Sequence, residues 1–162
     1  MEKITRRTAI QGAAGAATLT FIAGCLGDDD DDDEDDDRTP EEIAVDWVEA
    51  ADNVDSEDDI VDETGADSVT ILNGETGDAG NYIFDPGIVR IDEGTEVVWD
   101  WTSPGHDVTE VGEGATITDW DDESTTQGEG HEHSTTFDES GVALYECADH
   151  RAQNQRGAVI VE

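Results

Sequence analysis

The chain has 162 residues, of which 44 are Asp or Glu and only seven are Lys or Arg, and its formal net charge is −37 at pH 7. This charge excludes the basic face that a nucleic-acid-binding protein needs, so we expect no nucleic acid among its partners. Repulsion between so many carboxylates indicates a protein that works in concentrated salt. There the Debye length falls from about 10 Å at 0.1 M to about 3 Å at 1 M.

Residues 1–24 have the features of an export signal. The twin arginines Arg6 and Arg7 are followed by an uncharged stretch rich in alanine and glycine, which ends at Gly24. This stretch is too short and too weakly apolar for a transmembrane helix, which needs about 20 apolar residues. Residues 22–25, Ile-Ala-Gly-Cys, resemble a lipobox, in which the signal is removed and Cys25 carries a lipid. We expect a twin-arginine lipoprotein signal rather than a plain signal with a chance cysteine. The protein would then be lipid-anchored on the extracytoplasmic face of the cell membrane.

Residues 25–38 are expected to form a lipidated acidic tether. Positions 27–38 spell GDDDDDDEDDDR. A run of like charges cannot pack into a core and stays extended. Placed directly after the lipid, such a run would hold the rest of the chain away from the membrane.

An N-terminal helical segment is expected over residues 39–66. Thr39 is suited to the N-cap and Glu42 to the third helical position, which together form a capping box, with Pro40 between them at the first position. Ile43 and Trp47 are four residues apart and give the helix an apolar face. We expect this helix to end near residue 53 and to cover part of the domain that follows. Docking of a partner protein is the alternative use of that face.

From residue 67 onward the sequence has the pattern of a β domain. Apolar residues alternate with polar ones in many short segments, and turn signals such as Asp92-Glu93-Gly94 separate them. The expected strands are 69–71, 82–84, 88–91, 96–101, 106–111, 134–137, 142–145 and 157–161. Such a series predicts an all-β sandwich or barrel, here a single domain over residues 67–162. Residues 112–133 are rich in Gly, Asp, Glu and Thr and are expected to form a surface excursion.

One cysteine and two histidines form a candidate metal site. If Cys25 is lipidated, Cys147 has no disulfide partner and needs another role, either as a metal ligand or as an inert buried thiol. His150 follows three residues later on a loop between two expected strands, and His106 follows a Pro-Gly turn after another strand. Iron–sulfur clusters generally need four cysteines, and structural zinc usually takes four Cys or His ligands. One thiolate, two imidazoles and a weak fourth ligand instead match a type 1 copper site.

Gln155 is the expected fourth ligand, because it lies at the far end of the cysteine loop, just before the last strand. The alternatives are that Gln155 points away, or that the Gly105 carbonyl supplies a weak contact.

The other histidines, tryptophans and arginines have simpler expected roles. His131 and His133 would lie on one face of a strand and could bind a surface metal, but solvated side chains are expected in so acidic a loop. The expected core or rim aromatic residues are Trp99, Trp101 and Trp120. Arg151 and Arg156 flank the cysteine loop. They could form a docking patch for an acidic partner, but ordinary ion pairs are preferred.

Several motifs together resemble those of one known family. They are 62–69, Phe84-Asp85-Pro86, Gly94-Thr95 with Val97-Val98-Trp99, Gly105-His106, Thr136-Phe137 with Gly141, Tyr145-x-Cys147-x-x-His150 and Arg156-Gly157-Ala158-Val159. In these motifs, and in its lipoprotein start, the chain resembles the halocyanins, membrane-anchored cupredoxins of salt-loving archaea. The resemblance implies a Greek-key β-sandwich with one type 1 copper ion. It also implies His106, Cys147 and His150 as equatorial ligands.

The chain departs from the usual halocyanin pattern near the expected ligands. Gln155 stands where the family usually has methionine, as in a second cupredoxin group that is similar to stellacyanins. An amide oxygen there should favour Cu(II) and lower the reduction potential. Asp107 stands where Asn is common and Asp149 where Pro is common. Carboxylates at these positions should also favour the more highly charged metal, provided that they lie close to it.

The function predicted from the sequence is that of a blue copper protein, a one-electron carrier on the outer face of the cytoplasmic membrane. Its partners would be redox proteins of a respiratory chain, together with the membrane through the lipid on Cys25. The alternatives are copper storage or delivery, and a structural cupredoxin without copper. No activated nucleophile, second copper set or phosphate-binding loop is recognisable in the sequence, so no enzyme is predicted.

Overall fold

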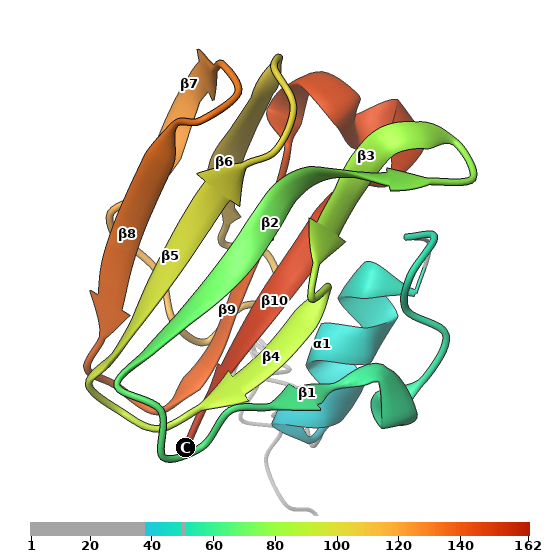
Figure 1. Ribbon diagram of the computed structural model, residues 1–162. Coiled ribbons are helices and arrows are strands. Elements are labelled where there is room, and N and C mark those ends of the chain that lie inside the picture. The colour runs from blue at the N-terminus through green and yellow to red at the C-terminus, as the bar shows by residue number, and fades with distance from the viewer. Residues whose placement is uncertain (1–37, 50) are drawn as a thin grey trace, which may run out of the picture. The chain divides into compact units, whose positions relative to one another are not determined.

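The computed structural model describes residues 38–49 and 51–162 (Figure 1). The predicted export signal, the lipidation site Cys25 and nearly all of the acidic tether lie outside the described residues. Within the described part of the chain, no helix has the length and apolar character needed to cross a membrane.

Two β-sheets pack face to face (Figure 1). The first has four strands in the order β3-β2-β5-β8, and the second has six in the order β1-β4-β10-β9-β6-β7. The strands of the first sheet are β2 (Ser68–Gly77), β3 (Gly80–Asp85), β5 (Thr95–Trp101) and β8 (Glu132–Phe137). Those of the second are β1 (Val61–Asp62), β4 (Ile88–Ile91), β6 (His106–Val111), β7 (Glu123–Gln127), β9 (Gly141–Glu146) and β10 (Arg156–Val161). The prediction of an all-β sandwich is confirmed.

An aromatic core lies between the sheets, because the strands alternate inward and outward side chains. Along β5, Val97, Trp99 and Trp101 are buried while the residues between them are more exposed. Trp99 stacks on Trp120 with 5.5 Å between ring centroids, and it meets Tyr145 edge-on at 5.4 Å. The prediction that these tryptophans are core or rim residues is confirmed.

A single α-helix, α1 (Pro40–Val48), covers the outer face of the second sheet among the described residues. The predicted capping box is present, since the Thr39 hydroxyl accepts from Glu42 N–H at 3.2 Å and the Glu42 carboxylate accepts from Thr39 N–H at 2.8 Å. The helix buries Ile43, Ala44 and Val48 in a second core. Their partners there are Ile88, Val142, Leu144, Ala158 and Ile160. The apolar face of the helix therefore covers the domain, as predicted.

The helix ends at Val48, earlier than the predicted end near residue 53. The chain turns there because the next residues are held against the sandwich. Ala51 and Val54 are buried in the second core, and the Asn53 side chain donates to the Phe84 carbonyl at 2.8 Å. A short 3-10 helix, η1 (Glu57–Asp59), follows before β1.

Several strands differ from the sequence-based expectation. Within the expected excursion 112–133, residues 123–127 form the edge strand β7, which pairs with β6. The sequence of β7 is Glu-Ser-Thr-Thr-Gln, and its central side chains are exposed, so it has no apolar alternation that could reveal it. β2 also continues to Gly77 through bulges opposite β3, beyond the end of the expected strand 69–71.

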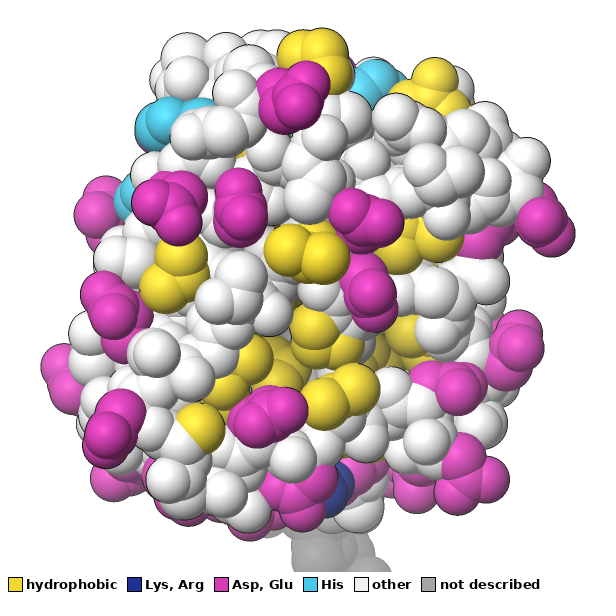
Figure 2. Space-filling model, viewed as in Figure 1, with side chains coloured by type: hydrophobic (Ala, Val, Ile, Leu, Met, Phe, Trp, Pro, Cys, Tyr) yellow, Lys and Arg dark blue, Asp and Glu magenta, His cyan; other side chains and the backbone are white. Residues whose placement is uncertain are grey.

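Carboxylates are distributed over the face of the protein shown in Figure 2, with small apolar areas between them. The described arginines have carboxylate or aromatic partners. Arg90, for example, lies 2.6 Å from Glu41 and 3.0 Å from Glu162. Isolated exposed ion pairs contribute little to stability, and salt screens the repulsion between the remaining carboxylates.

Replacing Val48 with alanine should lower the free energy of unfolding by about 1–2 kcal/mol, because two buried methyl groups leave the second core. Val45→Ala is the matched control, since it makes the same change in helix propensity at a half-buried position of the same helix. Denaturant unfolding in molar KCl would measure both. Equal losses in the two variants would contradict the packing described for α1.

Candidate metal centre

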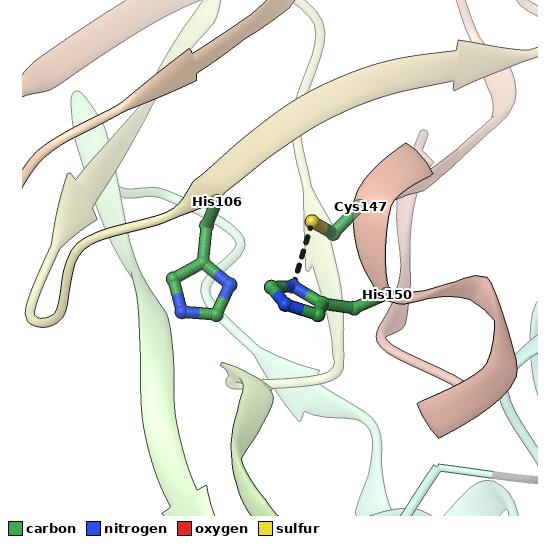
Figure 3. Close-up of side chains that lie close together, drawn as sticks. All are labelled: His106, Cys147 and His150. Carbon is green, nitrogen blue, oxygen red and sulfur yellow. Dashed lines mark hydrogen bonds between the residues drawn. The ribbon is translucent and has the colours of Figure 1, made fainter.

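Three predicted ligands meet at one end of the sandwich. His106 begins β6, Cys147 directly follows β9, and His150 lies in the 3-10 helix η2 (Ala148–Gln153) that follows. The three side chains point toward one another (Figure 3), and their potential ligand atoms all lie within 4.8 Å of one another. Cys147 Sγ is 3.2 Å from His150 Nδ1. Within the described residues no other group of three His, Cys, Asp or Glu side chains is arranged in this way.

The pairing of β6, β9 and β10 brings these residues together. β9 lies between the other two strands, so that Glu146 is opposite both Thr109 and Arg156. Backbone hydrogen bonds within the loop that connects β9 to β10 hold its two ends together. Cys147 N–H donates to the Gln155 carbonyl at 3.0 Å, and His150 N–H donates to the Cys147 carbonyl at 3.0 Å. The cysteine loop therefore has a fixed conformation that holds Cys147, His150 and Gln155 around one point.

The hydrogen bonds of His106 determine which ring nitrogen is free. Ser103 Oγ lies 2.7 Å from the Gly74 carbonyl, which can only accept, so the hydroxyl proton is directed there. The same Oγ must then accept from His106 Nε2, which is 3.1 Å away. Burial lowers the pKa of His106, which favours the neutral ring. The neutral ring carries its proton on Nε2, and Nδ1 keeps the lone pair that a metal ion needs.

Gly74 makes room for the His106 ring. Its φ of +94° is a conformation that favours glycine. A Cβ atom at this position would lie 2.8 Å from the His106 ring and 2.2 Å from Ser103 Oγ. Gly74 was not predicted as a site residue. Its location just after the apolar strand sequence 69–72 is the signal that could have found it, because an isolated glycine in a strand often marks a bulge or a close approach.

Gln155 is completely buried beside His106. Its Oε1 lies 2.8 Å from His106 Nδ1, and its Nε2 donates to Asn73 Oδ1 at 2.8 Å. The structure therefore brings the predicted fourth ligand to the other three residues, and its binding to a metal stays a prediction. Two acceptor atoms, Oε1 and Nδ1, face each other at this point. This arrangement is unfavourable by itself and suits a cation.

Cys147 is completely buried, and burial raises the pKa of its thiol to about 12. The thiol lies 3.3 Å from Asp107 Oδ2, to which it can donate. A metal ion would have to displace the thiol proton, because the thiolate is the form that binds metals. A thiolate and two imidazoles fit copper, which uses both ligand types.

Of the two acidic departures from the halocyanin pattern, Asp107 is the one whose carboxylate contacts a predicted ligand, Cys147. Its carboxylate accepts from Ala148 N–H at 2.9 Å and thereby braces the cysteine loop. The Asp149 carboxylate accepts from the Thr126 hydroxyl of β7 at 2.7 Å. The predicted electrostatic effect of carboxylates on the metal therefore applies to Asp107 more directly than to Asp149.

His150 gives the site its contact with the surface. It is half-buried, whereas His106 is only 2% exposed. The Tyr82 ring lies against it with 4.6 Å between centroids. Both line a surface pocket, whose other lining residues are Asn81, Ser103, Pro104, Gly105 and His106.

The remaining histidines lie elsewhere and are engaged with neighbours. His131 Nε2 is 3.3 Å from a Glu123 carboxylate oxygen, and its ring meets Trp101 edge-on. His133 Nε2 is 2.7 Å from the Asp121 carbonyl. Both side chains are half-buried, so they are partly solvated and also contact their neighbours. The excursion that carries them folds back on the sheet and forms β7, which was not predicted.

The two arginines beside the cysteine loop differ from each other. Arg151 forms an ion pair with Glu146, which confirms the preferred interpretation for this residue. The Arg156 guanidinium instead lies 4.3 Å from the centroid of the Trp47 ring, and its Nη1 donates to the Trp47 carbonyl at 3.3 Å. A cation–π contact therefore replaces the ion pair expected for Arg156.

Comparison with known proteins gives a consistent result. Residues 72–162 match the family model for copper binding proteins of the plastocyanin/azurin family. Halocyanin of Natronomonas pharaonis is 41% identical over 168 residues, and the alignment covers 100% of both chains. Among solved structures, pseudoazurin from Methylobacterium extorquens AM1 is 30% identical with a TM-score of 0.50, over 59% of this chain and 75% of that one.

Proposed function

The chain belongs to the plastocyanin/azurin family of copper-binding proteins as a halocyanin-like cupredoxin, and we propose that it carries single electrons through one type 1 copper ion. Membership of this family confirms the cupredoxin fold and the prediction that the chain is not an enzyme. The observation that carries the proposal is the convergence of His106, Cys147 and His150, whose ligand atoms lie within 4.8 Å of one another.

In this proposal His106, Cys147 and His150 hold the copper ion, and Gln155 provides a weak fourth contact. Bound copper supplies a one-electron couple between Cu(I) and Cu(II). The protein keeps the ligand side chains rigid. Ser103 Oγ holds His106 through its Nε2, and the hydrogen bond between Cys147 N–H and the Gln155 carbonyl holds the two ends of the cysteine loop together. Donor atoms held in place need little rearrangement when the charge of the site changes.

His150 is the exit for the electron in this proposal. His106 is the alternative port, but its Nε2 is directed at Ser103 inside the protein. Both histidines line the surface pocket, but His150 is half-buried there whereas His106 is only 2% exposed. A redox partner that docks over this pocket would come closest to the metal position at the His150 ring.

Burial of the thiol favours electron transfer over the alternative of copper storage or delivery. Metal exchange between proteins needs a thiol that an incoming partner can reach. Cys147 has no exposed surface, and His106 is only 2% exposed. The alternative of a structural module without copper is disfavoured by the two acceptor atoms that meet at His106 and Gln155, since a cation would relieve their repulsion.

We also propose that the protein is anchored by a lipid on Cys25 to the extracytoplasmic face of the cell membrane. The support is the order of the twin arginines, the uncharged stretch, Cys25 and the acidic tether in the sequence. A tethered domain would search for its partners in two dimensions. Redox proteins of a respiratory chain on the same membrane face are the partners that such an anchor would favour.

The electron-carrier proposal predicts a strong visible thiolate-to-copper charge-transfer band when the domain from residue 39 onward is folded in molar KCl and titrated with Cu(II). Ascorbate should bleach the band and an oxidant should restore it. Cys147→Ser is the control that should abolish the band. A folded protein without the band would refute the electron-carrier proposal and favour metal handling or a structural role.

Replacing Gln155 with methionine should raise the reduction potential, because the amide oxygen favours Cu(II) more than a thioether does. A tenfold change in the relative affinity for Cu(II) and Cu(I) corresponds to about 59 mV for one electron, and we expect at least this shift. Voltammetry of both proteins in the same salt would measure it. An unchanged or lower potential would contradict a role for Gln155 as an oxygen ligand.

The anchoring proposal predicts that Cys25→Ser releases the protein from the membrane fraction of its natural host or a salt-loving expression host. The unchanged chain should stay with the membranes and acquire the mass of a lipid on Cys25. Replacement of Arg6 and Arg7 by lysine is the companion variant, and it should retain the protein inside the cell. A Cys25→Ser protein that sediments with membranes as before would contradict the lipid anchor.

A further inference from the structure

We propose that Asn73 is a positioning residue that turns the carbonyl oxygen of the Gln155 amide, rather than its NH2 group, toward the metal position. This inference rests on the proposed function, because it concerns the weak fourth ligand of the copper site. Asn73 has no exposed surface and lies in β2, where the pairing with β3 is interrupted by a bulge. Its side chain is therefore directed into the ligand end of the sandwich.

The partners of the Asn73 side chain determine its orientation. Nδ2 lies 3.4 Å from the carbonyl oxygen of Asp107, which can only accept a hydrogen bond. The amide nitrogen of Asn73 must face that carbonyl, so Oδ1 faces the other way. Oδ1 then accepts from Gln155 Nε2 at 2.8 Å. With its nitrogen engaged in this way, Gln155 presents Oε1 to His106 Nδ1 at 2.8 Å.

A second chain of hydrogen bonds leads to the same place. The Gly74 carbonyl fixes the Ser103 hydroxyl, and that hydroxyl fixes the proton of His106 on Nε2. Both chains begin at a backbone carbonyl, which has no alternative donor state. They end in two acceptor atoms, His106 Nδ1 and Gln155 Oε1, which lie 2.8 Å apart. A cation that binds both atoms would lie beside the line that joins them, because metal bonds to nitrogen and oxygen are about 2.0–2.2 Å long.

Without Asn73, the opposite amide orientation would be preferred in the metal-free protein. If the Gln155 amide were turned by 180°, its NH2 group would donate to His106 Nδ1 and satisfy both groups. It would also occupy the lone pair that the metal needs, and an amide nitrogen has no comparable lone pair to offer. Asn73 prevents this turn, because its Oδ1 would then face another acceptor, Gln155 Oε1. Asn73 thus keeps the site ready for a metal at the expense of a hydrogen bond.

A structural role alone would give Asn73 a different set of consequences. Its backbone carbonyl accepts from Thr102 N–H at 2.9 Å and from the Thr102 hydroxyl at 3.2 Å, and any residue at position 73 retains these bonds. A purely structural side chain would lower stability without regard to what stands at position 155. A positioning role instead requires that the effect of Asn73 disappears when Gln155 is replaced.

The test is therefore a double-mutant comparison with copper bound. Asn73→Leu, of similar size, is made in the natural chain and in Gln155→Met, and the visible spectrum, the electron paramagnetic resonance spectrum and the reduction potential are measured. In the natural chain we expect an altered spectrum and a loss of about tenfold or more in Cu(II) affinity relative to Cu(I), as second-sphere changes typically cause. In Gln155→Met we expect neither change. Equal changes in both backgrounds, or none in either, would overturn the proposal.

A metal-free measurement on the unaltered chain tests the same inference independently of copper and of the folding of any variant. In nuclear magnetic resonance spectra, the Gln155 side-chain NH2 protons should exchange slowly with water and show their strongest cross-peaks to the Asn73 side chain. Strongest cross-peaks to the His106 ring would overturn the proposal. If the protein binds no copper, the proposed function fails, and this spectrum still decides the orientation of the amide.

Discussion

Burial of a polar cluster at one end of an apolar sandwich is the constraint on which this structure depends. His106, Asn73 and Gln155 have almost no exposed surface, and an unpaired polar group in such a place costs about 1–3 kcal/mol. Each of them has hydrogen-bond partners on other strands or on the loops that join them. The partners are specified by the register of those strands, so the sheet pairing and the geometry of the metal position are parts of one arrangement.

This dependence explains why the site is rigid on one side and accessible on the other. Cys147 and His106 are held inside by Asp107, Ser103 and the backbone of the cysteine loop. His150, on the outer turn of that loop, shares a surface pocket with Tyr82. With Cys147 and His106 held inside, the site can keep its geometry while its charge changes. The more exposed His150 leaves one imidazole available for contact with a partner. Both properties are what electron transfer requires of a protein scaffold.

The acidic surface and the buried site are largely separate features of the protein. The carboxylates are distributed over the outside (Figure 2), where salt screens them. Asp107 and Glu146 are buried, and the Asp107 carboxylate lies 3.3 Å from Cys147 Sγ. His106, the preceding residue, instead contacts two neutral side chains, Ser103 and Gln155. The acidic composition therefore reflects the salty solvent of the protein, and among the described acidic residues Asp107 is the one whose carboxylate contacts a predicted metal ligand.

The sequence by itself determined the elements whose signals are local. Alternating apolar residues revealed the main strands, the capping box revealed the helix, and the spacing of Cys147 and His150 identified the loop that holds them. His106 and Gln155 were also found, since a turn or a strand boundary marks each of them. These signals are contained within a few residues of the chain, so sequence reasoning can find them.

Only the tertiary structure decided which distant groups meet. Asn73 and Gln155 are 82 residues apart, and nothing in either local sequence indicates that their amides share a hydrogen bond. The roles of Gly74 and Asp107, the different partners of Asp149, and the polar edge strand β7 have the same origin. Such contacts depend on strand order and register, and these are set by the packing of the whole sandwich rather than by any one segment.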